Sequence, residues 1–150
     1  MPTIMLSPHF TLQEFTVSET AARAGISNQP DAAALENLKK TAAVMEKVRT
    51  LLGDKPITIT SGYRGPQVNA LVGGSTNSAH MVGLAADFVC PGFGDVYDTC
   101  KKIQPHLAEL GIDQLIWEYD SWTHIGLRDP GDPRCQCLTI NNNGTVMSIA

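Results

Sequence analysis

The sequence has little positive charge and lacks any long apolar run. Its 11 Lys and Arg residues stand against 15 Asp and Glu residues, which gives a net charge of -4. A protein that binds a phosphate backbone needs clustered Lys and Arg, so a nucleic-acid partner is excluded. No apolar stretch approaches the roughly 20 residues that span a bilayer, so we expect no membrane insertion. Residues 1–9 lack the basic start and apolar core of a secretory signal, so we expect synthesis in the cytoplasm without a signal peptide.

Cysteine is also scarce, and its spacing does not fit a metal knuckle. Cys135 and Cys137 are separated by one residue, and no second close pair completes a tetrahedral zinc site. Residues two apart in a strand lie on one face, so these two thiols could lie side by side. Because a cytosolic chain keeps its thiols reduced, we expect all four cysteines to be free, as small buried or half-exposed residues.

The length and the order of the expected elements indicate one domain of the α+β class. The 150 residues contain no internal repeat and no Ser/Gly linker, so we expect a single domain over residues 1–150. Helical spacing and caps predict helices over 18–24, 31–52, 68–71 and 95–110, the last kinked or shortened by Pro105. Strands are predicted over 57–60, 84–89, 115–117, 123–127, 138–141 and 145–149, with a hairpin turn at Asn143-Gly144. Because helices come first and strands cluster late, we expect a mainly antiparallel sheet with N-terminal helices packed on it.

The segment SAHMVGLAAD, residues 78–87, sets a histidine and an aspartate among small and apolar neighbours. The flanking Ala85, Ala86 and Phe88 indicate that Asp87 is buried. A buried carboxylate costs several kcal/mol unless it is paired or bound to a metal. Spacing alone leaves two interpretations open: a metal ligand, or a structural Asp satisfied by backbone N–H groups or by an arginine such as Arg64.

The segment WEYDSWTHI, residues 117–125, adds acids and another histidine between two predicted strands. His80, Asp87 and His124 together offer two imidazoles and one carboxylate. That set suits Zn2+ at the sheet, in a tetrahedral site whose fourth position is left for water. One carboxylate halves the charge of the ion, so a bound water can still be acidified towards neutral pH. The alternative is that no metal binds, and that His80 and Asp87 form a buried hydrogen-bonded pair.

Three separated motifs resemble one known family. SGYRGPQVNALVGGSTN, SAHMVGLAAD and WEYDSWTHIG, in this order, resemble the D-alanyl-D-alanine carboxypeptidase family of zinc peptidases. The opening HFTLQEFTVSETAARAGISNQP is similar to the start of its small single-domain branch, so the resemblance covers residues 9–127. This family includes wall-cleaving carboxypeptidases, phage endolysins and virion-associated wall hydrolases, and its fold is related to Hedgehog signalling domains.

The resemblance implies roles for individual residues around the expected zinc ion. It implies that His80, Asp87 and His124 bind Zn2+. It also implies that an acid shortly before the last histidine is the general base. We take Glu118, in the WEY segment, as this base, and Asp120 is its competitor.

Further residues are assigned to the substrate. The resemblance implies that Arg64 polarises the substrate carbonyl or holds a carboxylate, and that Ser78 contacts the substrate. Tyr63, Trp117 and Trp122 could line a substrate groove, with core packing as the alternative for at least one tryptophan. Peptide hydrolysis needs a proton acceptor for the attacking water and positive charge where the oxyanion develops, which these residues can provide.

The resemblance implies a peptidase that cuts the stem peptides of bacterial peptidoglycan. It allows a D-alanyl-D-alanine carboxypeptidase, a phage endolysin released onto the wall, or a wall hydrolase held among phage virion proteins. The net charge of -4 speaks against the endolysin, because no basic patch is present to bind an anionic wall. The alternative function is a non-catalytic zinc-stabilised binding or structural module, since a fold and its metal can persist without activity.

Overall fold

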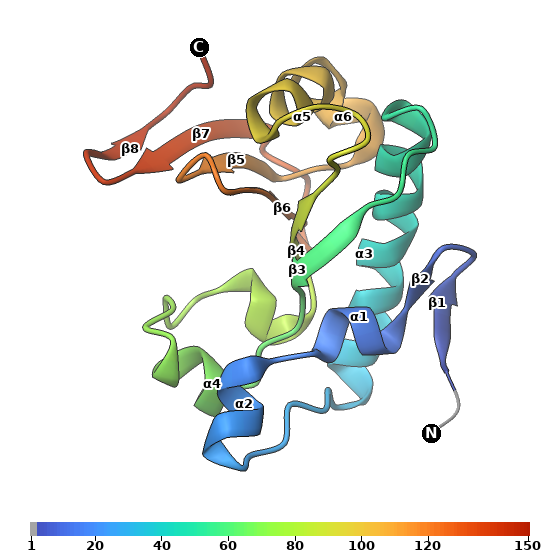
Figure 1. Cartoon of the computed structure of the whole chain (residues 1–150), viewed down its shortest axis with the longest axis vertical. Coiled ribbons are helices and arrows are strands. Elements are labelled where there is room, and N and C mark those ends of the chain that lie inside the picture. The colour runs from blue at the N-terminus through green and yellow to red at the C-terminus, as the bar shows by residue number, and fades with distance from the viewer. Residues whose placement is uncertain (1–2) are drawn as a thin grey trace.

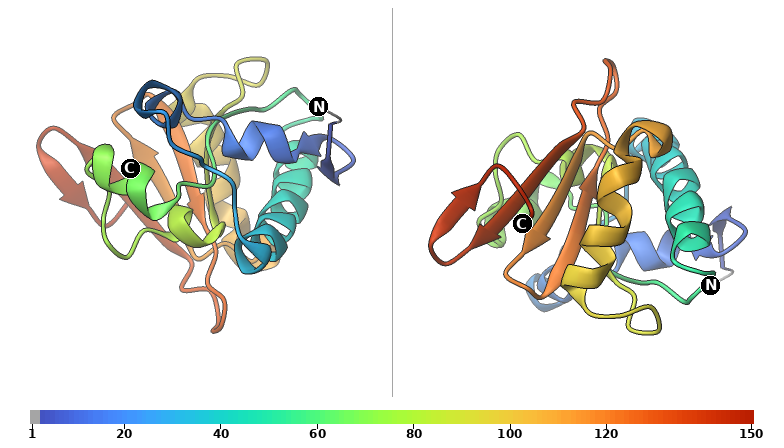
Figure 2. Two further views of the ribbon diagram at one scale, coloured as in Figure 1. Left: turned by 90° about the horizontal axis from the view of Figure 1, so that it is seen from below. Right: turned by 90° about the horizontal axis from the view of Figure 1, so that it is seen from above.

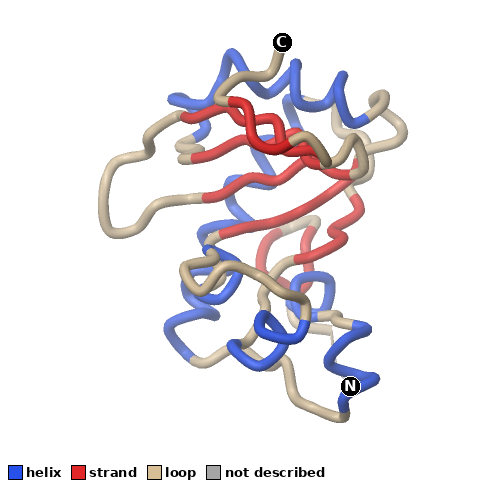
Figure 3. Tube along the Cα trace, turned by 90° about the vertical axis from the view of Figure 1, so that its left-hand side faces the viewer, coloured by secondary structure: helices blue, strands red, loops and turns tan. Residues whose placement is uncertain are grey.

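The computed structural model describes residues 3–150 and is built around a six-stranded sheet. Its strands lie in the order β3-β4-β6-β5-β7-β8 (Figure 3). Their bounds are Thr58–Ser61 for β3, Ala85–Val89 for β4, Gln114–Glu118 for β5, Trp122–Gly126 for β6, Gln136–Asn141 for β7 and Gly144–Val146 for β8. All neighbours pair antiparallel except β5 and β7, which run parallel. The predicted α+β class with a mainly antiparallel sheet is confirmed.

The two longest helices cover one face of this sheet. Helix α3 (Ala32–Leu51) begins at Asp31, whose side chain accepts a hydrogen bond from the Ala34 N–H. Its apolar face is buried through Leu38, Met45 and Val48, and the helix packs beside α5 (Val96–Ile103) against the sheet (Figures 1 and 2). As expected, Pro105 interrupts the last helical stretch: the 3-10 turn η2 (Gln104–His106) separates α5 from α6 (Leu107–Leu110). No helix in residues 3–150 has the length and apolar character needed to cross a membrane.

Shorter elements lie at the end of the molecule away from α5 and α6, in the lower half of Figure 1. They are β1 (Met5–Ser7), β2 (Phe10–Thr11), α1 (Leu12–Thr16), α2 (Glu19–Ala24), α4 (Pro66–Leu71) and the 3-10 turn η1 (Ala79–Val82). The predicted helices at α2 and α4 are present, whereas β1, β2 and α1 were not predicted. Elements of two to five residues are too short to show a period of their own. Instead, buried Phe10 and Phe15 pack edge to face and hold this segment on the core.

The hairpin between β7 and β8 turns one residue earlier than predicted. Asn141 pairs with Gly144, so the two-residue loop consists of Asn142 and Asn143. Gly144 starts β8 with a φ of +112°, a conformation that glycine adopts without strain. The last strand also ends at Val146 rather than at residue 149, because Ile149 turns in to join the core.

The four cysteines are unpaired, and two of them lie in the core. Cys100 is fully buried beneath β6, with its Sγ 3.3 Å from the Thr123 hydroxyl. Burial raises the pKa of the Cys100 thiol to about 11. A protonated thiol is a poor nucleophile and a poor metal ligand, so this cysteine acts as a packing residue.

Gly83 ends η1 and sets how closely this turn approaches α3. Its φ is +82°, and an added Cβ would lie 2.6 Å from the Ala34 carbonyl oxygen. We predict that Gly83→Ala lowers the free energy of unfolding by about 3 kcal/mol, because left-handed strain and overpacking each cost roughly 1–3 kcal/mol. Gly73→Ala is the matched control, since Gly73 has a φ of +71° with open space around it. We expect Gly73→Ala to lower the free energy of unfolding by about 1 kcal/mol. Equal losses of free energy in the two variants, measured by urea unfolding, would contradict the close approach at Gly83.

Candidate metal centre

Strand register brings polar side chains from three neighbouring strands onto one face of the sheet. Asp87 of β4 lies opposite His124 of β6, and Trp122 of β6 lies opposite Glu118 of β5. Side chains alternate between the two faces of a strand, so Asp87, His124 and Glu118 share a face. Their chain neighbours Ala86, Phe88 and Ile125 point the other way, into the core under α3 and α5. The site therefore lies on the sheet face that these helices leave open.

The turn η1 brings His80 to the same point from outside the sheet. Ser78 caps this turn, because its hydroxyl accepts a hydrogen bond of 3.2 Å from the His80 backbone N–H. The His80 Nδ1 lies 2.6 Å from the Gly62 carbonyl oxygen. A carbonyl can only accept, so Nδ1 is the donor here, and Nε2 is the ring nitrogen that faces Asp87. This is the usual arrangement behind a metal-binding histidine, in which one ring nitrogen donates and the other coordinates.

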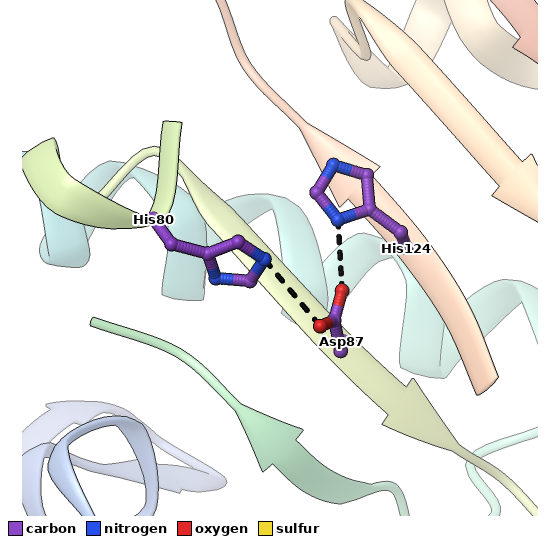
Figure 4. Close-up of side chains that lie close together, drawn as sticks. All are labelled: His80, Asp87 and His124. Atoms are coloured by element: carbon purple, nitrogen blue, oxygen red, sulfur yellow. Dashed lines mark hydrogen bonds and ion pairs between the residues drawn. The ribbon is translucent and has the colours of Figure 1, made fainter. Parts of the chain in front are cut away.

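Figure 4 shows the three predicted ligands pointing toward one another. The His80 Nε2 lies 3.4 Å from the Asp87 Oδ2, and the His124 Nδ1 lies 2.8 Å from the Asp87 Oδ1. One possible ligand atom from each residue lies within 4.8 Å of the other two. None of the three residues is more than 8% exposed. The expectation that positions 80, 87 and 124 converge is confirmed.

The donor set and its spacing fit Zn2+. Two ligand atoms bound at about 2.0–2.2 Å with a tetrahedral angle between them lie about 3.4 Å apart. The distance of 3.4 Å between the His80 Nε2 and the Asp87 Oδ2 matches this value. Two imidazoles and one carboxylate make a three-ligand set, which is typical of catalytic rather than structural zinc. The site would bind the ion through Nε2 of His80, Nδ1 of His124 and the Asp87 carboxylate.

Asp87 is held as an anion despite its burial. Desolvation by itself would raise the pKa of this carboxyl. The hydrogen bonds and charges of His124 and His80 outweigh desolvation, and they hold the pKa of Asp87 well below its usual range. An ionised carboxylate is the form that coordinates a metal, so Asp87 needs no deprotonation to act as a ligand.

Glu118 lies next to this cluster at the end of β5. Its Oε1 lies 3.8 Å from the His124 Nδ1, and its side chain is 18% exposed. Burial and, to a smaller extent, the Asp87 charge raise the pKa of Glu118, while His124, Arg64 and the Trp122 indole oppose this rise. A half-buried acid with a raised pKa beside a metal site is suited to accepting and returning a proton.

Asp120 is not brought to the cluster. Tyr119 and Asp120 form a tight two-residue turn with φ values of +53° and +51°, closed by a hydrogen bond from the Ser121 N–H to the Glu118 carbonyl. This turn directs Asp120 towards the opposite face, where its Oδ1 accepts a 2.9 Å hydrogen bond from the Trp117 indole. Of the two acids considered for the base, only Glu118 faces the metal ligands.

Arg64 and Ser78 lie together beside the metal ligands. The Arg64 Nη2 donates a hydrogen bond of 3.2 Å to the Ser78 hydroxyl. The Arg64 Nε is buried and finds no hydrogen-bond partner among residues 3–150. Both residues and Trp122 line an open cleft of about 990 Å³ above the metal ligands.

Tyr63 does not line the cleft, although it borders a separate cavity together with Arg64, and its contact with substrate stays a prediction. The residue is 7% exposed and belongs to the hydrophobic core. Its backbone N–H donates to the Phe15 carbonyl and its carbonyl accepts from Asn28, so the chain is held with the ring inside.

The far end of the cleft is bounded by a loop that the sequence patterns did not single out. Residues 127–135 join β6 to β7 and project past the sheet (orange in Figure 2). Arg134 anchors this loop, since its Nε and Nη2 lie 3.0 and 2.7 Å from the carboxylate of buried Asp113. The two partners lie 21 residues apart and carry no motif, so only the fold reveals this pair.

The Arg134–Asp113 pair gives a stability prediction with a defined pH dependence. Hydrogen bonds from the Arg134 side chain hold the pKa of Asp113 below its usual range, against the opposing effect of burial. The pair therefore stabilises the fold above the unfolded pKa of about 3.9, and this contribution is lost as the pH falls through the lower folded pKa. We expect Arg134→Met to cost about 1–2 kcal/mol at pH 7, and the cost to shrink below about pH 4.

Urea unfolding at pH 7 and pH 3 measures this difference. The control is Lys40→Met, which removes an exposed ion pair between Lys40 and Asp129 of the same loop. Its cost should stay near 0.5 kcal/mol or below, since exposed pairs contribute about 0–1 kcal/mol. A pH-independent cost for Arg134→Met would show that the side chain acts by packing alone.

Comparison with known proteins agrees with this geometry. Residues 8–126 match the family model of Peptidase M15, so the chain belongs to the M15 peptidases. Over 56 residues it is 45% identical to the zinc D-Ala-D-Ala carboxypeptidase of Streptomyces albus G. That stretch spans 37% of this chain and 22% of the relative, so most of the relative has no counterpart in the match. The predicted family is confirmed, and the family and the donor set together support Zn2+ as cofactor.

Proposed function

We propose that this chain hydrolyses the stem peptides of bacterial peptidoglycan as a zinc-dependent peptidase. The convergence of His80, Asp87 and His124 beside Glu118, at the floor of an open cleft, carries the proposal. Membership of the M15 family and the likeness to a zinc D-Ala-D-Ala carboxypeptidase support peptidoglycan as the substrate.

We assign the metal ligands and the proton transfers to separate residues. His80, Asp87 and His124 hold the ion. Bound Zn2+ supplies a Lewis acid that polarises the scissile carbonyl and lowers the pKa of water at the open position. Glu118 accepts the proton of the attacking water and returns it to the leaving amine, for which its raised pKa and its position 3.8 Å from His124 are suited.

Arg64 and its neighbours position the substrate in this proposal. The Arg64 guanidinium places positive charge at the cleft, where it stabilises the developing oxyanion or holds a substrate carboxylate. The Ser78 hydroxyl orients that guanidinium through its hydrogen bond and contacts the substrate. The indole of Trp122, opposite Glu118, forms one wall for the bound peptide.

The cellular context belongs to the same proposal. We propose one catalytic domain over residues 1–150. It acts on the bacterial wall as a D-alanyl-D-alanine carboxypeptidase, as a phage endolysin that is released onto the wall, or as a wall hydrolase among virion proteins. A non-catalytic zinc module would gain support if neither Glu118 nor Asp120 faced the metal site, and the position of Glu118 3.8 Å from His124 favours the peptidase instead.

Mass analysis of fragments released from purified peptidoglycan tests the proposal. We expect release of D-alanine or of stem-peptide fragments, and loss of that release with a zinc chelator. The masses identify the bond that is cut. No release by the zinc-loaded protein would overturn the enzymatic function and favour the binding module.

A further inference from the structure

A second, smaller cavity opens where β5 and β7 end, and we call it the end groove. Its volume is about 270 Å³. Aromatic rings, aliphatic side chains, a carboxylate and two amides line it, and the lining includes Trp117, Tyr119, Asp120, Ile140, Asn141 and Asn142. The parallel pairing of β5 with β7 brings these two strand ends together, with Trp117 beside Thr139 and Glu118 beside Ile140. Neither the metal ligands nor Glu118 lines this cavity.

The end groove adjoins the metal cleft. Tyr119 and Ile140 line both cavities, so they form the ridge between them. The loop over 127–135 lies at the other end of the cleft, because β6 and β5 run antiparallel and Gly126 pairs with Gln114. A substrate that leaves the cleft over the ridge of Tyr119 and Ile140 reaches the end groove.

The aromatic side chains of the end groove are held in place before any ligand arrives. The Trp117 indole donates its N–H to Asp120 at 2.9 Å and packs against Tyr97, with ring centroids 4.9 Å apart. Tyr119 is 46% exposed, and its ring lies 5.8 Å from that of Trp122. Rigid, partly exposed aromatic rings bind a ligand with little loss of side-chain entropy.

The turn that displays these groups is strained. Tyr119 and Asp120 both have left-handed backbone, with φ values of +53° and +51°. Two-residue turns of this kind favour Asn-Gly, and residues with a bulky Cβ substituent are disfavoured in them. Backbone strain at a turn beside a cleft is typical of residues whose side chains have a functional role.

We propose that the end groove binds one N-acetylated hexose of the glycan strand that carries the stem peptide. This inference rests on the proposed function, since it extends that substrate beyond the cleft. A sugar ring presents a face of C–H groups that packs on an aromatic ring, and Trp117 and Tyr119 provide such rings. Its hydroxyl and acetamide groups need hydrogen-bond partners, which Asn141 and Asn142 supply at the rim.

The binding test uses a β-1,4-linked tetramer of N-acetylglucosamine, titrated into the zinc-loaded protein and followed by NMR. The main variant, Tyr119→Asn with Asp120→Gly, removes the aromatic ring and the carboxylate but installs the residues that the turn favours. We expect about fivefold to tenfold weaker binding, together with an unchanged or higher Tm. Weaker binding without loss of stability separates a ligand site from a structural role.

A second pair of variants probes the amide rim without touching the strained turn. We expect Asn142→Ala to weaken binding about threefold, as the loss of one hydrogen bond would. Asn143→Ala is the matched control, because this exposed neighbour in the same two-residue loop does not line the groove. No binding by the wild type, or equal binding by all variants, would overturn the inference.

A kinetic comparison keeps this inference separate from the proposed function. We expect the wild type to cleave stem peptide attached to glycan with a higher kcat/KM than free stem peptide, and the turn variant to lose about fivefold of that preference. Cleavage of both substrates with equal kcat/KM by the wild type would reject the groove and leave the peptidase in place. Cleavage of neither would reject the peptidase, while the sugar titration would still decide the groove.

Discussion

Replacing Glu118 by Gln is expected to abolish most hydrolysis while the metal stays bound. Gln keeps the size of the side chain but cannot accept a proton, so kcat/KM should fall about 10²- to 10⁴-fold, the usual contribution of a general base. Because Glu118 lies 3.8 Å from His124 and is not in the ligand set, zinc content should remain at the wild-type level. Hydrolysis of a stem peptide and metal analysis of the same sample measure both quantities.

The matched control for Glu118→Gln is Asp120→Asn, two residues away. It makes the same change of charge, and the new amide oxygen can still accept the hydrogen bond from Trp117. We expect less than about a threefold loss on free stem peptide, because Asp120 faces away from the ligands. A large loss in Asp120→Asn with full activity in Glu118→Gln would move the base role to Asp120.

Replacing His80 by Ala is expected to remove the metal. The wild type should bind about one zinc ion per chain, and the variant should fall to background, since a zinc site with two protein ligands left is weak. Hydrolysis should be lost with the ion. Metal analysis of the purified proteins and thermal unfolding with and without chelator give two independent readouts.

Chelation connects the metal site to the stability of the fold. A ligand that binds only the folded state raises its stability, so the chelator should lower the Tm of the wild type and leave that of His80→Ala in place. His106→Ala is the control, since His106 pairs with Glu109 on the outside of the molecule and lies apart from the cluster. A wild type free of zinc after reconstitution would contradict the metal centre.

Most of the fold could be predicted from local patterns. The stripe and caps of α3 predict its bounds to within a residue, and the β-branched and apolar runs predict β3 and β4. Patterns of this kind work because burying one face imposes its period on the residues. They do not detect β1, β2 and α1, since each is too short to repeat its period and depends on Phe10 and Phe15 reaching the core.

The candidate site divides in the same way. His80, Asp87 and His124 are identifiable because imidazoles and a carboxylate among apolar residues need a partner to offset desolvation. The sequence does not show whether Glu118 or Asp120 is the general base, because both acids precede the same histidine in the chain. In the structure, a left-handed turn and the alternation of side chains along β5 direct Glu118 to the ligands and Asp120 to Trp117.

Residue types and their order along the chain were thus sufficient for the α+β class, the family and the three side chains that converge at the candidate metal centre. Only the tertiary structure decided that Tyr63 lies in the core, that Arg134 reaches Asp113, and that an aromatic groove adjoins the cleft. The physical reason is the separation along the chain over which each interaction acts. Burial and helical or strand period act between neighbours in sequence, whereas these contacts join residues that meet only when separate strands and turns pack together.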